Sequence, residues 1–112
     1  AGPPAALPLA SLSQLLALSA CQVLESYGVE PALKWPNDLQ VRGRKIAGIL
    51  AETVVTGSEF LGLVLGIGVN LNLDATVIAT VDQLATALNL ELGRYVSVLT
   101  FRDALLETFF SR

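Results

Sequence analysis

The sequence predicts an α+β fold in which a mainly antiparallel sheet is flanked by helices. Three observations predict it: helical periodicity over residues 9–28, short strands joined by tight turns over residues 31–70, and renewed helical patterns over residues 80–111. Helices in such a layout pack onto the sheet and bury its apolar face. Residues 1–8 are rich in Pro, Ala and Gly, and we expect a linker or a cut end there.

The first helix is predicted from apolar side chains at helical spacing. These are Leu12, Leu16, Val23 and Tyr27, with the small Ala20 between them. Gly28 is the expected stop at the C-terminal end. Ser11 or Ser13 could cap the start, because a serine oxygen can accept a hydrogen bond from an unpaired backbone N–H of the first turn.

The sheet is predicted from strand-like segments separated by turn residues. The segments are residues 31–35, 39–41, 45–55 and 60–70. Pro36 ends the first of them, since proline cannot donate to a strand ladder. Gly43 is free to take the positive φ that a tight hairpin turn needs, and residues 56–59 form a second turn. Strands joined this closely pair as an antiparallel meander.

Two capping-box patterns predict the starts of C-terminal helices. Residues 80–83 form the first pattern, and Leu84 and Leu88 follow it. Residues 100–103 form the second. The apolar residues behind this second box are Leu105, Leu106, Phe109 and Phe110.

Composition limits what this chain can be. It has 112 residues, of which 53% are apolar and 15% charged, against roughly 25% charged residues in ordinary globular proteins. One domain, or a piece of one, fits this length. The chain holds no methionine and begins Ala1-Gly2-Pro3-Pro4, so we expect a fragment of a longer protein. Its single cysteine, Cys21, forms no internal disulfide, which fits a cytoplasmic origin.

Charge and hydropathy argue against two classes of function. The net charge of -3 and a pI near 4.7 are unlike those of nucleic-acid binders, which are normally basic. Mean hydropathy is +0.61, yet no apolar run reaches the ~18 residues that a membrane span needs. We therefore expect neither nucleic-acid nor membrane contact.

The strand at residues 60–70 has two unlike faces, because side chains alternate along a strand. One face is a continuous apolar wall that should pack against helices, made of Leu61, Leu63, Leu65, Ile67 and Val69. The opposite face is nearly bare at Gly66 and Gly68, with Asn70 just beyond them. Paired glycines on one face often mark the close approach of a ligand or backbone, although they can also relieve crowding or allow a bulge.

Residues 34–39 place polar side chains in an apolar segment. Lys34 should point opposite to Leu33 and Trp35, and an ammonium group among apolar neighbours usually has an anion to meet. The alternative is a strand-end lysine that reaches solvent along its stem. Asn37 and Asp38 could equally be ordinary turn residues, since both readily hydrogen-bond local backbone.

The strand that follows carries further charges. Arg44 and Lys45 flank the hairpin turn and are expected to be solvated. Gly48 shares a face with Ile46, Leu50 and Glu52. Glu52 lies among apolar neighbours, so it needs water or a cation, and Lys34 or Arg44 could supply the cation.

Taken together, these segments resemble the biotin protein ligase family. The resemblance runs through Lys34-Trp35-Pro36-Asn37-Asp38-Leu39, then Arg44-Lys45-Ile46-Ala47-Gly48-Ile49-Leu50 with Glu52, and closes with Gly66-Ile67-Gly68-Val69-Asn70-Leu71-Asn72. It covers nearly the whole chain and implies the biotin/lipoate ligase fold, which is class II synthetase-like. Residues 1–112 would then be the central and C-terminal part of a single catalytic domain.

The resemblance implies a two-step, ATP-dependent reaction. Biotin and ATP give biotinyl-5′-adenylate and pyrophosphate, and a lysine of a biotin carrier domain then takes the biotinyl group. Lys34 would be the catalytic residue and would contact both biotin and the nucleotide, since a fixed ammonium stabilises charge that develops at phosphorus. Magnesium would accompany ATP, although the sequence offers no convincing set of protein ligands for the ion. A homodimer in the cytoplasm is also implied.

The resemblance also assigns roles to residues around Lys34. Gly66 and Gly68 would lie beside biotin, and Asn70 would meet the adenine side of the nucleotide. The strand lining the biotin pocket would contain Gly48, Ile49 and Leu50. Asn37 and Asp38 would order the turn that aims Lys34, and Asp38 could reach magnesium indirectly.

One departure from the family leaves two other functions open. Nothing in residues 1–9 matches the Gly- and Arg-rich loop that covers biotin in the family, and a small C-terminal β domain is also absent from this sequence. The chain alone should therefore be nearly inactive. The alternatives are a non-catalytic binding module of the same fold and a ligase for another carboxylic acid, such as lipoate.

Overall fold

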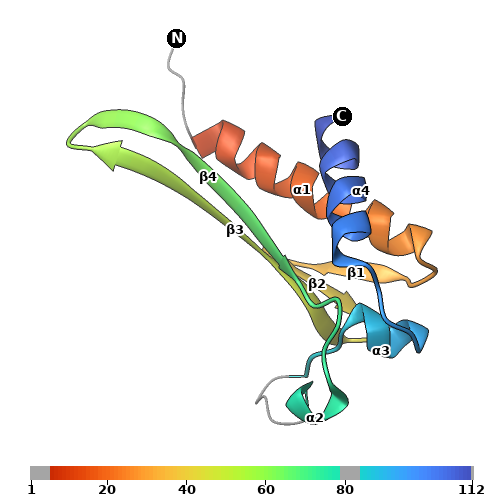
Figure 1. The fold of residues 1–112 in the computed structure, drawn as a ribbon. Helices are drawn as coiled ribbons and strands as arrows, with labels where there is room; N and C mark the ends of the chain where they lie inside the picture. Colours follow the sequence, from red (N-terminus) through yellow and green to blue (C-terminus); the bar gives the residue numbers. More distant parts are fainter. Residues whose placement is uncertain (1–5, 79–83, 112) are drawn as a thin grey trace.

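The computed structural model describes residues 6–78 and 84–111. A long helix, α1 (Ala6–Ser26), comes first. The strands are β1 (Pro31–Lys34), β2 (Asp38–Val41), β3 (Arg44–Thr56) and β4 (Glu59–Val69). The helices after the sheet are α2 (Ala75–Ile78), α3 (Leu88–Leu92) and α4 (Val98–Phe110). Figure 1 shows α1 and α4 lying together over the sheet, as the predicted α+β layout requires.

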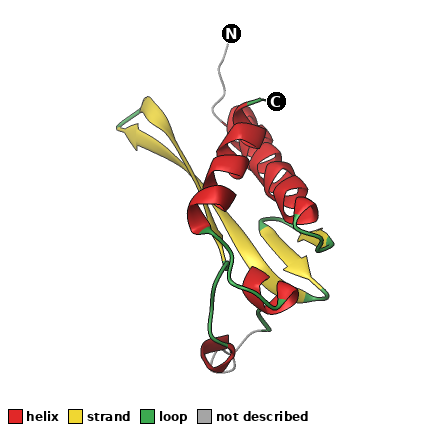
Figure 2. Cartoon of the chain, turned by 45° about the vertical axis from the view of Figure 1, so that its right-hand side comes forward, coloured by secondary structure: helices red, strands yellow, loops and turns green. Residues whose placement is uncertain are grey.

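The strands form one antiparallel sheet in the order β1-β2-β3-β4. The predicted meander is therefore confirmed. The turn between β2 and β3 consists of Arg42 and Gly43, with φ of 53° and 78°, which is the signature of a two-residue type I′ hairpin turn. The long β3–β4 hairpin runs past the helices, and Figure 2 shows its tip projecting away from them.

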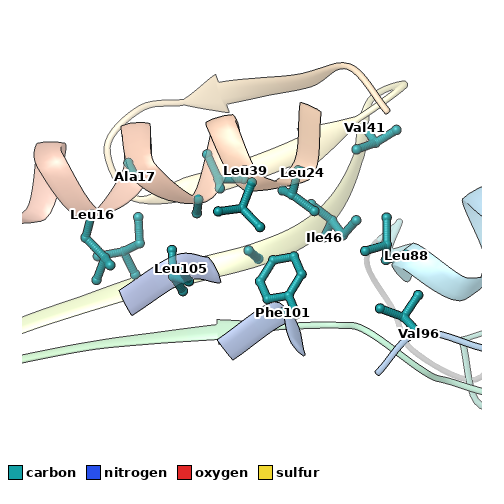
Figure 3. Packing of buried hydrophobic residues seen from close by; sticks show 14 residues of the cluster. Leu16, Ala17, Leu24, Leu39, Val41, Ile46, Leu88, Val96, Phe101 and Leu105 are labelled. Atoms are coloured by element: carbon teal, nitrogen blue, oxygen red, sulfur yellow. The ribbon is translucent and has the colours of Figure 1, made fainter. Parts of the chain in front are cut away.

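The core lies between the sheet and the two long helices (Figure 3). Leu24 of α1 and Leu39 of β2 are fully buried there, as is Ile46 of β3, and Phe101 of α4 closes the cluster. Burying each such side chain contributes about 1.5–3 kcal/mol of transfer free energy. The sheet is thus held from one side, and the other side is left for other contacts.

The apolar wall predicted on β4 is confirmed along only part of the strand. Leu65, Ile67 and Val69 pack against the core cluster. Leu61, by contrast, is 57% exposed. Leu61 is close to the turn of the hairpin, because β3 ends at Thr56 and β4 begins at Glu59. The tip of the hairpin projects away from the helices (Figure 2). The predicted alternation holds from Gly62 to Val69 but fails at Leu61. Val54 pairs with Gly62 and Val55 with Phe60, so Leu61 is an extra residue on β4, and its predicted burial was wrong.

The first helix begins earlier than predicted. Residues 6–8 belong to α1 and not to a linker, while residues 1–5 lie outside the described part of the chain. Ser11 and Ser13 therefore lie inside the helix and do not cap it. Pro8 is compatible with this start, because the first turn of a helix leaves its N–H groups unpaired in any case. The C-terminal stop is confirmed, since α1 ends at Ser26 and Gly28 follows with φ of 98°.

The C-terminal helices also differ from the prediction. Residues 80–83 lie outside the described part of the chain, so the first capping box is untested. Residues 84–87 are not helical, because Ala85 forms a parallel bridge with Lys45. Helix α3 begins only at Leu88. The short α2 helix was not predicted.

Helix α4 begins at Val98, two residues before the second predicted box. Its cap is Ser97, whose side chain accepts a hydrogen bond from the backbone N–H of Thr100 at 3.2 Å. Thr100 is therefore not the cap, and the earlier serine takes that role because its oxygen reaches the unpaired N–H. No helix in the described ranges is long and apolar enough to cross a membrane.

Candidate functional site

The strand register places one residue from each strand in a single row across the sheet. Lys34 pairs with Asp38, Asp38 with Gly48, and Gly48 with Gly68. Residues directly opposite one another in antiparallel strands present their side chains to the same face. The predicted lysine and two of the predicted glycines therefore share one face of the sheet, and this shared face is the candidate site.

The site face is the one turned away from the helices. Leu33 and Trp35 border a cavity of about 110 Å³ that Ala17 of α1 also lines, so they lie on the helix side. Lys34, between them, lies on the other side and is exposed. Among the described residues, no ion pair includes Lys34. The amine is therefore available to an anion that approaches this face.

The glycines of β4 leave open space on the site face. A Cβ atom added at Gly66 or Gly68 would meet no described atom within 4 Å. Neither residue has a positive φ, and the bulge between β3 and β4 lies elsewhere, at Val54 and Val55. Within the described residues, neither crowding nor a bulge explains these glycines. Close approach by a ligand, the other explanation, is favoured.

Gly48 is crowded by comparison. A Cβ atom there would lie 3.3 Å from Cε and Nζ of Lys45 and 3.7 Å from Oδ1 of Asp38. Nζ of Lys45 lies 3.3 Å from the same Oδ1. The lysine side chain therefore crosses directly over Gly48 to reach Asp38. The expectation that Lys45 is solvated was wrong, since only 32% of its side chain is exposed.

A β-bulge explains why Lys45 was missed. Leu39 pairs with Ala47 but Gln40 pairs with Lys45, so Ile46 is an extra residue on β3. The expectation that Ile46 shares a face with Gly48 was therefore wrong, and Ile46 is fully buried in the core. Gly48 lies three residues after Lys45, so simple alternation puts the two on opposite faces of the sheet. One extra residue between them brings the side chain of Lys45 to the same face as Gly48. The hairpin turn alone gives no sign of the bulge, because the bulge depends on how the two strands pair.

Ile49 and Leu50 are divided between the two faces. Leu50 is 57% exposed and pairs with Gly66, so it belongs to the site face. Ile49 belongs to the buried core cluster. The structure therefore brings Leu50 next to the glycines but places the side chain of Ile49 beneath the sheet, where it can only support the strand.

The turn after Lys34 is fixed by backbone contacts. The Trp35–Pro36 peptide bond is cis. The backbone N–H of Ile49 donates to the carbonyl oxygen of Asn37 at 2.9 Å, which attaches the turn to β3. The side chain of Asn37 is exposed, whereas that of Asp38 is paired with Lys45. An ordering role for this pair, as predicted, would rest on the backbone carbonyl of Asn37 and the carboxylate of Asp38.

Asn70 connects the end of β4 to the segment before α3. Its side-chain Nδ2 donates to the carbonyl oxygen of Thr86 at 3.0 Å. Its backbone N–H donates to Ile46 at 2.8 Å, and its carbonyl oxygen accepts from Leu88 at 2.9 Å. Within the described residues, Oδ1 of Asn70 accepts no hydrogen bond. One side-chain atom is thus used for structure, and the other can accept a bond from a ligand.

Asn72 has a purely structural environment. Its Nδ2 donates to the carbonyl oxygen of Val96 at 2.7 Å, and its Oδ1 accepts from the N–H of Val96 at 2.8 Å. Both polar atoms of the amide are therefore bonded to the backbone of one residue, Val96. This arrangement attaches the loop after β4 to the segment that leads into α4.

The remaining acidic residues that the structure describes do not form a metal site. Glu52 is exposed and lies opposite Val64, and none of the ion pairs among the described residues includes it. Neither Lys34 nor Arg44 pairs with it among the described residues, and its side chain is open to solvent. No group of three or more Cys, Asp or Glu side chains within residues 6–78 and 84–111 could hold a metal ion.

Comparison with known proteins supports the same family. The family model described as "Biotin/lipoate A/B protein ligase family" matches residues 3–70. The bifunctional ligase/repressor BirA of Escherichia coli is 34% identical over 83 residues, which is 73% of this chain and 25% of the relative. The BirA of Bacillus subtilis is 36% identical over 70 residues, or 59% of this chain and 22% of the relative.

Solved structures agree with the sequence relatives. The apo structure of biotin protein ligase from Aquifex aeolicus matches 92% of this chain and 44% of its own, with a TM-score of 0.76 and 27% identity. The structure of that ligase with biotin and ATP gives a TM-score of 0.72 at 26% identity, over 92% of this chain and 42% of its own. This chain thus spans less than half of these structures and about a quarter of the BirA sequences. Because the family model matches more than half of its residues, the chain belongs to the biotin/lipoate A/B protein ligase family.

Proposed function

We propose that this chain is part of an ATP-dependent ligase that adenylates biotin and transfers it to a lysine of a biotin carrier domain. The observation that carries the proposal is the row that joins Lys34 to Gly68 across the sheet. The row provides Lys34, which has no ion pair among the described residues, beside a strip of open backbone. A carboxylic acid with a long, flat apolar body fits such a surface.

The first step joins two anions, which repel each other, and the positive charge of Lys34 reduces this repulsion. The biotin carboxylate oxygen attacks the α-phosphorus of ATP, the bond to the β-phosphate oxygen breaks, and pyrophosphate leaves. The ammonium group of Lys34 holds both anions together and stabilises the negative charge that grows on the α-phosphate oxygens. Removing one such electrostatic contact typically costs about 10²–10³ in turnover.

The second step forms the amide. The amine of the carrier lysine attacks the carbonyl carbon of biotinyl-5′-adenylate, the acyl–phosphate bond breaks, and AMP leaves with the electron pair. No covalent bond to this chain is needed, which agrees with a sequence that holds no histidine and a single cysteine on the helix side of the sheet.

The other residues of the site face contact different parts of the two substrates. Gly66 and Gly68 let the biotin chain lie against the backbone, and Gly48 and Leu50 continue that surface toward β3. Asn70 offers its Oδ1, which accepts no hydrogen bond from a described residue, to the adenine amine. Ile49 supports this strand from the core side.

The described residues do not form a magnesium site, because Asp38 is the row's one carboxylate and Lys45 occupies it. Magnesium would therefore arrive with the ATP phosphates, as it commonly does. The proposal further includes residues 1–112 as part of a single catalytic domain, a cytoplasmic location, and homodimer formation.

The test is biotin-dependent exchange of labelled pyrophosphate into ATP by the intact protein that carries this sequence. Replacing Lys34 with Gln should lower exchange by about 10²-fold or more, while circular dichroism shows an unchanged fold. Arg44→Gln, an exposed cation of the same hairpin, is the matched control and should leave exchange unchanged. Near-normal exchange by Lys34→Gln would refute the role of this lysine.

The same assay separates the competing functions. A protein that binds biotin but exchanges no pyrophosphate is a binding module. A protein that exchanges pyrophosphate with lipoate and not with biotin is a ligase for a different acid. Either result would overturn the proposed reaction, although both are compatible with the family.

A further inference from the structure

Glu91 of α3 is a buried carboxylate whose two oxygens have different partners. Only 8% of its side chain is exposed. Its Oε2 accepts a hydrogen bond from Oγ1 of Thr86 at 2.5 Å, and its Oε1 lies 3.0 Å from Nη2 of Arg42. A buried carboxylate is costly unless it is paired and hydrogen-bonded. Glu91 is therefore fixed between the β2–β3 turn, which contains Arg42, and the segment that precedes its own helix.

Thr86 is held through each of its polar groups. Its backbone N–H donates to the carbonyl oxygen of Lys45 at 2.9 Å. Its hydroxyl donates to the carboxylate of Glu91, which is the stronger, charge-assisted kind of hydrogen bond. Its carbonyl oxygen accepts from Nδ2 of Asn70 at 3.0 Å. Thr86 is only 3% exposed, so water does not readily replace these partners. The position of its carbonyl therefore depends on Glu91 as well as on the backbone.

The Thr86 carbonyl determines which way the side-chain amide of Asn70 faces. A carbonyl oxygen can only accept, so the NH2 group of the amide must face it and Oδ1 is turned to the other side. That Oδ1 accepts no hydrogen bond from a described residue. An oxygen held in this orientation can accept from an amine but cannot donate to a carbonyl group. A purine with an amine at the contacted ring position, as in adenine, is thus favoured over one with a carbonyl oxygen there.

We propose that Glu91 is a positioning residue that, through Thr86, holds the amide of Asn70 in the orientation that selects the amine of adenine over a carbonyl oxygen at the same ring position. This inference rests on the proposed ligase function. It assigns Glu91 no contact with biotin or ATP. Without the carboxylate, the Thr86 hydroxyl loses its acceptor and the neighbouring carbonyl is less firmly held. The amide of Asn70 can then turn over and donate to a carbonyl group of the base.

The experiment measures pyrophosphate exchange by the intact protein with ATP and with inosine triphosphate, which has a carbonyl oxygen where adenine has its amine. The native protein should prefer ATP by about tenfold or more in kcat/KM. Glu91→Met should reduce this preference about five- to tenfold, since one oriented hydrogen bond is lost. Glu107→Met removes an exposed carboxylate of α4 and should leave the preference unchanged.

The ratio of the two nucleotides separates positioning from a purely structural role. A general loss of stability would lower exchange with both nucleotides alike and leave the ratio unchanged. An unchanged ratio in folded Glu91→Met would therefore overturn the inference. Equal use of both nucleotides by the native protein would overturn it as well.

Variants of Thr86 test the route of the effect. Thr86→Val removes the hydroxyl and should reduce the preference for ATP as much as Glu91→Met does, whereas Thr86→Ser keeps the hydroxyl and should retain the preference. Adding Glu91→Met to Thr86→Val should lower the preference by less than about twofold further. An undiminished effect in that background would overturn the inference, since Glu91 would then act without Thr86. If Glu91→Met does not fold, Thr86→Val carries the same test.

The proposed function is judged separately by Lys34→Gln. Loss of exchange in that variant, together with an unchanged nucleotide preference in Glu91→Met, rejects this inference alone. Near-normal exchange by Lys34→Gln refutes the role of the lysine, whatever the variants of Glu91 show.

Discussion

The two ends of the β3–β4 hairpin share one hydrogen-bonded ladder but have different surroundings. At the inner end, Ile46 and Ile49 belong to the core beneath α1 and α4. In the outer arm, which we define as residues 53–63, Val55 and Leu61 are each 57% exposed. Both ends contain β-branched and apolar residues in alternation. Burial therefore depends on which part of the ladder the helices cover, and not on the strand pattern itself.

The candidate site lies at the covered end. Lys34, Asp38, Gly48 and Gly68 occupy a row whose opposite face is packed against the helices. A site that must hold reacting atoms in place gains from a rigid support. The outer arm has no such support, and the following tests compare the two regions, beginning with the largest expected effect.

Leucine-to-alanine substitutions should distinguish the regions most strongly. Leu39→Ala, at a fully buried position in the covered part, should lower the free energy of unfolding by about 2–5 kcal/mol. Leu61→Ala in the outer arm should lower it by less than about 1 kcal/mol, since little apolar area is lost there. Urea unfolding of the intact protein measures both. Equal losses would mean that the outer arm is packed against another part of the protein.

Glycine-to-alanine substitutions test whether the open space serves a ligand. Gly66→Ala or Gly68→Ala should weaken biotin binding by about tenfold or more, because a methyl group forced into a filled contact costs about 1–3 kcal/mol. Gly62→Ala is the control, since its Cβ also meets no described atom and it lies in the outer arm. Isothermal titration of the intact protein gives the affinities. Equal affinity for biotin in all three variants would show that Gly66 and Gly68 do not lie beside bound biotin.

Replacing either of the two asparagines after β4 should affect a different property: stability for Asn72, and the KM for ATP for Asn70. Asn72→Ala removes both hydrogen bonds to Val96 and should cost about 1–3 kcal/mol of stability, with no specific change in the KM for ATP. Asn70→Ala removes only the bond to Thr86, so its stability loss should be smaller, but it should raise the KM for ATP. Thermal unfolding and exchange kinetics measure the two effects. An unchanged ATP dependence of Asn70→Ala would leave that residue a purely structural role.

The smallest expected effect concerns Cys21 on α1. Burial, and secondly the neighbouring Glu25 carboxylate, raise the pKa of this thiol. A raised pKa means less thiolate at neutral pH, so alkylation by iodoacetamide should be slower than for a free thiol until the pH exceeds the raised pKa. Unfolding in urea should remove the difference. A folded-state rate equal to the unfolded rate would show that α1 does not shield this residue.

Much of the fold was determined locally by the sequence. The meander, the turn at Gly43 and the stop at Gly28 follow from alternation and from turn chemistry, which act over a few residues. The placement of Lys34 on a face opposite to Leu33 and Trp35 follows from the same alternation. The grouping of Lys34 with Gly48, Gly66 and Gly68 came from the family resemblance, and the strand register then placed these residues on one face.

Other features were decided by contacts between distant parts of the chain. Leu61 is exposed near the hairpin tip, which projects away from the helices, and Ser97 rather than Thr100 caps α4. The partners of Asn70 and Asn72 lie 16 and 24 residues away in sequence. Lys45 reaches Asp38 only because one extra residue in β3 reverses its face. Periodicity fixes which residues alternate, whereas the pairing of strands and the cover of helices fix which of them meet.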